Sequence, residues 1–181
     1  GSLLAEWVDG KLERALNFDR EDDYVEVSDS PSLNVNKITI GAWIKTTQNA
    51  SSAPQILGKV TSDGIGGYAL FLYGEDGSGY VYGLIYTNDW QWIESTTPVN
   101  DGNWHFIALT FDGSSLKVYI DGILNNQTNI SGSINQVAAP IRIGASKETG
   151  ENIFDGTIDE IRIYNRALSE QEIKELYYGV R

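Results

Sequence analysis

Residues 87–92, with the sequence TNDWQW, combine aromatic rings and short polar side chains in a way that suits sugar binding. The C–H faces of a sugar can stack on flat rings, while its hydroxyl groups hydrogen bond to carboxylates and amides. We therefore predict that this segment binds carbohydrate by shallow stacking. Its candidate ligand-binding residues are Asn88, Asp89, Trp90, Gln91 and Trp92.

Tyrosines in the preceding segment extend this candidate surface. Residues 80–87 alternate, with Val81 and Ile85 on one face and Tyr82 and Tyr86 on the other. The aliphatic face is expected to meet the core, which leaves Tyr82 and Tyr86 on an outer sheet surface. The alternative is that the Trp and Tyr rings fill the core between two sheets, with their polar ends at its rim.

A cluster of acids near the start of the chain is the candidate metal site. Asp19, Glu21, Asp22 and Asp23 crowd one turn, where their charges repel unless water or a cation separates them. Calcium takes about six to eight oxygen ligands in flexible geometry, and carboxylates supply them well. We predict that Asp19 and Asp23 bind Ca²⁺, the alternative being a solvated acidic turn.

Catalysis has little support in the residue types present. The chain has one histidine and no cysteine, and His105 alternates in phase with Ile107 and Leu109, as a packed strand residue would. Nucleophilic triads built on histidine therefore lack their parts. We expect a protein that binds its ligand without converting it.

Composition excludes several other function classes. The 181 residues include 13 Lys and Arg against 25 Asp and Glu, a formal net charge of -12. Nucleic acids and anionic membrane surfaces attract clustered positive charge, so neither is an expected partner. The acidity fits cation binding, a neutral polysaccharide, or simply solubility. No apolar run approaches the roughly 20 residues of a membrane span.

The elements that must position these residues are almost all strands. Short runs of alternating or β-branched residues, separated by Gly, Asp, Asn and Pro turns, predict an all-β sandwich. Trp43 and Trp104 are expected to fill its core. The expected strands are 15–18, 24–27, 38–45, 55–60, 68–73, 80–87, 90–95, 105–111, 116–121, 141–144 and 156–164.

A single helix is expected at the C-terminus. Ser169 is a good N-cap, and Glu172 follows three residues later, as in a capping box. Ile173, Leu176 and Tyr177 form an apolar stripe at helical spacing. Residues 1 and 2, Gly-Ser, are typical of a cloning remnant, so one domain is predicted over residues 3–181.

Four segments, taken in order, resemble laminin G-like domains of the concanavalin A-like lectin and glucanase jelly rolls. The resemblance covers most of the chain, from Ala15 to Ser169. The segments are the acidic opening ALNFDREDDYVEV (15–27), the tryptophan strand ITIGAWIK (38–45), the hairpin DGNWHFIALTFDGSSLKVYIDG (101–122) and the closing FDGTIDEIRIYNRALS (154–169).

The resemblance implies a two-sheet antiparallel jelly roll, glycan or protein binding, and frequently a calcium ion. It also implies that the first and last strands pair, which would bring Asp159 to the acidic turn as a third calcium ligand. Related glucanases carry alternating acids of the form Glu-x-Asp-x-x-Glu along one strand, and no such stretch falls on a strand here. The loop in which pentraxins hold calcium acids corresponds to residues 145–148 (ASKE), which largely lack them.

We therefore expect a non-catalytic carbohydrate-binding module with structural calcium, belonging to a larger secreted or cell-surface protein such as a polysaccharide-degrading enzyme. Its partner would be a polysaccharide or glycan, and the module would be monomeric and tethered to other domains. Two alternatives remain at this stage: a protein-interaction or adhesion module, and a structural spacer domain.

Overall fold

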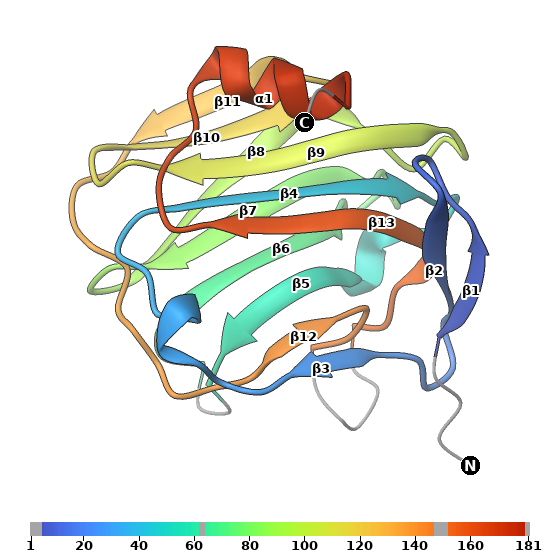
Figure 1. Cartoon of the computed structure of the whole chain (residues 1–181), viewed down its shortest axis with the longest axis horizontal. Helices are drawn as coiled ribbons and strands as arrows, with labels where there is room; N and C mark the ends of the chain where they lie inside the picture. The colour runs from blue at the N-terminus through green and yellow to red at the C-terminus, as the bar shows by residue number, and fades with distance from the viewer. Residues whose placement is uncertain (1–4, 62–63, 147–151, 180–181) are drawn as a thin grey trace.

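The computed structural model describes residues 5–61, 64–146 and 152–179, which form two packed antiparallel β-sheets and one short α-helix (Figure 1). The first sheet has seven strands in the order β1 (Glu6–Asp9), β2 (Arg14–Asp19), β13 (Asp155–Tyr164), β4 (Ile38–Lys45), β9 (Trp104–Phe111), β10 (Ser115–Ile120) and β11 (Ile123–Asn129). The predicted all-β sandwich with a C-terminal helix is confirmed.

Part of the second sheet lies behind the first in the view of Figure 1, and the rest lies below it. Its six strands follow the order β3 (Val25–Val27), β12 (Ile141–Ile143), β5 (Gln55–Val60), β6 (Gly67–Tyr73), β7 (Tyr80–Tyr86) and β8 (Trp90–Pro98). Two short 3-10 turns, Pro31–Leu33 and Ala50–Ser52, lie in the connections.

The main core lies between the two sheets and is built from alternating residues of both. On β4 the even positions Ile38, Ile40, Ala42 and Ile44 all face it, as the period-2 pattern predicts. The sheets pack closely at Gly83 of β7, where an added Cβ would lie 2.2 Å from Cδ1 of Leu109 on β9.

A smaller second cluster covers the outer face of the seven-stranded sheet. Helix α1 (Glu170–Tyr177) packs there, with Tyr177 stacked on Trp43 at a centroid distance of 5.3 Å. Trp43 is buried, but the expectation that it fills the core between the sheets is wrong. The residues on either side of it, Ala42 and Ile44, point into that core, so Trp43 points outward and needs the helix as cover.

The capping box of α1 is confirmed. Ser169 Oγ accepts a hydrogen bond from the backbone N–H of Glu172, and Glu172 Oε2 accepts one from the backbone N–H of Ser169. Among the described residues, no helix is long and apolar enough to cross a membrane.

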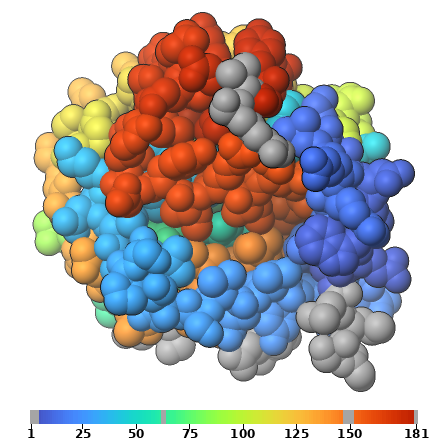
Figure 2. All heavy atoms as spheres, in the orientation of Figure 1, coloured from blue at the N-terminus to red at the C-terminus, as the bar shows by residue number. Residues whose placement is uncertain are grey.

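The first and last parts of the chain meet on one face of the molecule. In Figure 2 the red C-terminal segment lies beside the blue N-terminal hairpin, and β13 pairs with β2 in register. The predicted domain limits at residues 3 and 181, the cloning remnant at residues 1 and 2, and residues 147 and 148 of the pentraxin-like loop lie outside the described residues.

Candidate ligand-binding surface and acidic turn

Four aromatic rings lie together on the outer face of the six-stranded sheet. Phe71 and Tyr73 come from β6, Tyr82 from β7 and Trp92 from β8. Tyr82 is central: it stacks on Phe71 at 5.4 Å and on Trp92 at 5.8 Å, and meets Tyr73 edge-on at 5.5 Å. We call these four residues the aromatic platform.

Trp92 is the accessible end of this platform. Its side chain is 57% exposed, and the Tyr82 and Trp92 ring planes are only 21° apart. Because one face of the indole packs on Tyr82, most of its exposure comes from the opposite face and the edges. β8 is the edge strand of its sheet, and its free edge meets β11 of the other sheet, where Asn126 Nδ2 donates to the Glu94 carbonyl at 2.8 Å. The open face suits stacking on a flat apolar surface.

The phenol of Tyr82 is held neutral beside the exposed indole. Desolvation, followed by a hydrogen bond to Glu94 on the neighbouring strand, raises the pKa of Tyr82 to about 12. The hydroxyl therefore donates to the Glu94 carboxylate at neutral pH. Glu94 lies on the same outer face as Trp92, so the platform has a carboxylate at its margin.

The other predicted binding residues are spread around this surface. Trp90 is half-buried and pinned, because its Nε1–H donates to the Gly64 carbonyl at 2.8 Å and its ring meets Tyr86 edge-on at 5.3 Å. Asn88 and Asp89 are exposed at the β7–β8 turn, where Asp89 Oδ1 accepts from the backbone N–H of Trp90.

Gln91 does not join the two tryptophans. It pairs across the ladder with Ile85, whose side chain faces the main core, so Gln91 points away from the outer face. Phe71 and Tyr73 are platform members that the sequence reasoning did not select. Their alternation with buried Leu70 and Leu72 was the signal that placed them outside.

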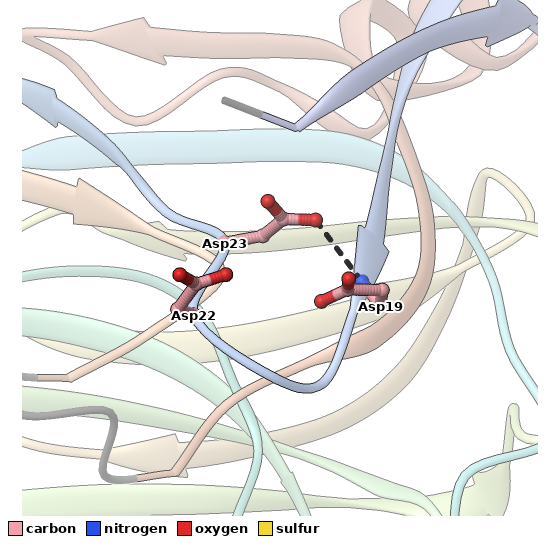
Figure 3. A group of neighbouring side chains, drawn as sticks. All are labelled: Asp19, Asp22 and Asp23. Carbon is pink, nitrogen blue, oxygen red and sulfur yellow. Dashed lines mark hydrogen bonds between the residues drawn. The ribbon is translucent and has the colours of Figure 1, made fainter. Parts of the chain in front are cut away.

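The acidic turn brings three of its four carboxylates together. Carboxylate oxygens of Asp19, at the end of β2, and of Asp22 and Asp23, in the loop that follows, lie within 4.8 Å of one another (Figure 3). That spread fits oxygen atoms around one calcium ion, whose ligands lie at about 2.3–2.6 Å from the metal. Within the described residues, Glu21 is not part of this group.

Asp23 is the buried member of this group, and burial disfavours its charged form. Its side chain is only 5% exposed, and its Oδ2 accepts a hydrogen bond from the backbone N–H of Asp19 at 3.2 Å. Desolvation is the main cause that raises the pKa of Asp23, and the neighbouring charges of Asp19 and Asp22 raise it further. A buried carboxylate with two acidic neighbours is stabilised by a cation.

The expectation that Asp159 approaches this turn is wrong. β13 does pair with β2, but Asp155 is the residue opposite Asp19. Asp159 lies four residues further along, roughly 13 Å away at about 3.3 Å per residue. There it is buried and accepts hydrogen bonds from the backbone N–H groups of Leu12 and Glu160, which ties the β1–β2 turn to β13.

His105 is fixed between two carboxylates. Its Nδ1 lies 2.9 Å from Asp121 Oδ2, and its Nε2 lies 3.2 Å from Asp101 Oδ1. Hydrogen bonds from Asn103, and then from His105, lower the pKa of Asp101 to about 2. Both ring nitrogens are thus engaged in holding the ends of the β9–β10 hairpin, as a structural role requires.

Three comparisons relate this chain to known proteins. The mouse protein "Sushi, von Willebrand factor type A, EGF and pentraxin domain-containing protein 1" is 29% identical over 156 residues, 81% of this chain. The chain spans only 3–4% of the length of the curated relatives it matches.

Solved structures share the fold at lower identity. Domain 4 of an extracellular arabinanase from Geobacillus stearothermophilus, solved in complex with arabinotriose, has a TM-score of 0.78 and 21% identity, covering 98% of this chain and 82% of that one. The binding domain of Paraclostridial Mosquitocidal Protein 1 has a TM-score of 0.74 and 18% identity, covering 97% and 45%.

A third comparison shows the family. Its match runs from the acidic turn at the end of β2 into helix α1. The laminin G-type family model matches residues 19–174, most of the sandwich described above. The chain is therefore a member of the concanavalin A-like lectin/glucanases superfamily.

Proposed function

We propose that this chain is a non-catalytic carbohydrate-binding module that holds a glycan against the aromatic platform. The observation that carries the proposal is the open indole of Trp92, 57% exposed and braced from behind by Tyr82. A large apolar ring left in water costs free energy that a ligand recovers by covering it. The arabinotriose complex of the arabinanase domain supports the same class of ligand for this fold.

In this proposal, the ligand is held by stacking on an aromatic ring and by hydrogen bonds to polar side chains around it. A sugar ring lies on the free face of Trp92, and its hydroxyls reach Glu94 on one side and Asn88 and Asp89 at the turn on the other. Because the Phe71–Tyr82–Trp92 stack is already packed, little side-chain freedom is lost on binding. Such an open surface suits an internal stretch of a polysaccharide chain.

Calcium is proposed as a structural ion at Asp19, Asp22 and Asp23. The three carboxylates, together with carbonyl groups of the turn, would hold the ion where β2 passes to the second sheet. The ion would stabilise the turn at a distance from the platform and take no part in stacking. We further propose that the module works outside the cell or at its surface, as a monomer tethered to other domains.

The test is retention of the protein on a panel of insoluble and soluble polysaccharides, with arabinan, xylan and β-glucan as probes, in calcium and in excess chelator. We expect retention on at least one glycan, and we expect Trp92→Ala to abolish it while the far-ultraviolet circular dichroism and melting temperature stay unchanged. Trp7→Ala is a matched control, because Trp7 is also exposed, at 61%, but lies on β1 of the other sheet.

Retention that survives Trp92→Ala would overturn the platform as the binding site. A variant that unfolds would instead assign Trp92 a packing role, and Trp92→Phe would then separate the two effects. Failure to bind any glycan would favour a protein-interaction module. This second function is supported by exposed apolar residues outside the platform, which could contact a protein partner. They are Trp7, Ile123 and Tyr178.

A further inference from the structure

The far side of the sandwich carries a pocket that the aromatic platform does not include. It has a volume of about 270 Å³ and lies on the outer face of the seven-stranded sheet. One row of its floor crosses three paired strands, from Thr157 on β13 to Lys45 on β4 and Trp104 on β9. Asp155 lines one side, and Asp9 reaches it from β1.

Polar groups around this pocket are available to a ligand. Among the described residues, the side chains of Asp9, Lys45, Thr47 and Asp155 and the indole N–H of Trp104 take part in no hydrogen bond or ion pair. The half-buried Trp104 ring packs with one part against the cluster beneath α1 and lines the pocket with another. The expectation that it fills the core between the sheets is therefore wrong.

The walls of the pocket are held rigidly by buried polar residues. Thr46 Oγ1 donates to the Asp155 carbonyl at 2.5 Å, and Gln48 Oε1 accepts from the Asp155 backbone N–H at 2.8 Å. Both side chains are buried, at 3% and 4% exposure. Gly156 completes the fit, because a Cβ there would lie 2.4 Å from the Lys45 carbonyl oxygen. A site held this way is formed before its ligand arrives.

We propose that this pocket binds a single sugar residue at the end of a glycan chain. The carboxylates of Asp9 and Asp155 accept hydrogen bonds from sugar hydroxyls, Lys45 and Thr47 supply donors, and Trp104 offers an apolar wall to the C–H groups. At about 270 Å³ the pocket lies just below the roughly 300–1,000 Å³ that is typical of small-molecule sites, which suits one sugar residue. Recognition here is thus independent of the platform.

The experiment is an NMR titration of the whole chain with L-arabinose, D-xylose, D-glucose and D-galactose, in excess chelator. Trp104→Phe keeps an aromatic ring against the cluster and removes one indole N–H signal, which assigns the Trp104 resonance. We expect one sugar to shift that resonance at millimolar concentration. The double variant Asp9→Asn with Asp155→Asn should weaken this binding by about tenfold or more, because charge-assisted hydrogen bonds become neutral ones.

Trp92→Ala is the control, and it should leave the shift of Trp104 unchanged. The proposal is overturned if none of the four sugars shifts the Trp104 indole, or if the two acid substitutions leave the affinity intact. It is also overturned if the shift disappears with Trp92→Ala or requires calcium, since the effect would then belong to the platform or to the acidic turn. Polysaccharide retention by the platform is read separately, so either proposal can fail alone.

Discussion

Three tryptophans show how neighbours, and not residue type, decide what an indole does. Trp43 is covered by α1, Trp90 is pinned by the Gly64 carbonyl, and Trp92 is left open on Tyr82. Alternation along the strand gives Trp90 and Trp92 the same face, but it left open whether that face is exposed or buried. It could not reveal what covers a face, because the covering helix and loop come from distant parts of the chain.

At this scale the calcium proposal makes a prediction about Asp23. In excess chelator, Asp23→Asn should be as stable as the parent or slightly more so, because the substitution removes a buried charge with acidic neighbours and keeps an acceptor for the Asp19 N–H. Calcium should raise the melting temperature of the parent, since it binds only the folded form, and should leave Asp23→Asn unmoved.

The pH dependence of stability, compared between the parent and Asp23→Asn, is a second test of the buried Asp23 carboxylate. The folded-state pKa of Asp23 lies above its ordinary value of 3.8, so folding takes up a proton in the window just above that value. The free energy of unfolding of the chelated parent, measured relative to Asp23→Asn, should therefore rise as the pH falls through this window. Glu21→Gln, an exposed acid outside the cluster, is the control that should keep the calcium response. A calcium shift that persists in Asp23→Asn would remove this residue from the site.

Among the described strands, the two that the sequence did not reveal are the edge strands of the larger sheet, β1 and β11. An edge strand pairs on one side only, and its residues need little burial, so the alternating apolar signal is weak. β11 reads ILNNQTN, and Ile123 is 66% exposed. β4 and β9 contact the main core on one face and the cluster beneath α1 on the other, so their apolar signal is strong. Both strands were predicted correctly.

Helix α1 could be predicted because its N-cap and its apolar stripe lie within one short segment of the chain. The capping residue Glu172 also makes the helix sensitive to pH. The Arg166 side chain, followed by the Ser169 N–H, lowers the pKa of Glu172 from its ordinary 4.5 to about 2. This carboxylate contributes stability that is present above pH 4.5 and is lost as the pH falls towards 2. We therefore expect the α1 resonances in ¹H–¹⁵N NMR spectra to shift and broaden over that range.

Glu172→Gln provides the comparison for the helix. The variant should show weaker protection of the α1 amides at neutral pH, and its spectrum should change less between pH 4.5 and 2. Equal acid responses in parent and variant would assign the change to other carboxylates. Because Trp43 stacks on Tyr177, its indole resonance reports whether the helix has left the sheet.

At the scale of the whole molecule, the two sheets pack closely where Gly83 of one meets Leu109 of the other. Gly83→Ala should cost about 1–3 kcal/mol of unfolding free energy, because the new methyl group meets Leu109 in a filled core. Chemical denaturation measures this cost. In the double variant with Leu109→Ala the methyl gains room, so the two losses should sum to more than the loss measured for the pair. Simple additivity would show that the sheets do not meet there.

Sites that depend on sheet order were the ones that sequence reasoning missed or misplaced. Asp159 was assigned to the acidic turn because pairing of the first and last strands was foreseen, but the register was not. The pocket was not foreseen at all, since Asp9, Lys45, Trp104 and Asp155 come from four strands far apart in the chain. Local alternation of apolar residues predicts where strands lie in the sequence. The register of a strand and its neighbours in the sheet depend on packing between distant segments.

The position of β13 has a consequence for how the chain is made. This strand lies between β2 and β4 in the seven-stranded sheet, yet it follows all the other described strands in the chain. During synthesis the edges of β2 and β4 that face β13 must wait unpaired until residues 155–164 have left the ribosome. The sheet closes only when this long-range pairing forms, and until then the open strand edges invite pairing with other nascent chains. Truncation before residue 155 would leave a gap in the middle of the sheet, so a shortened product should be degraded or aggregate instead of persisting as a smaller domain.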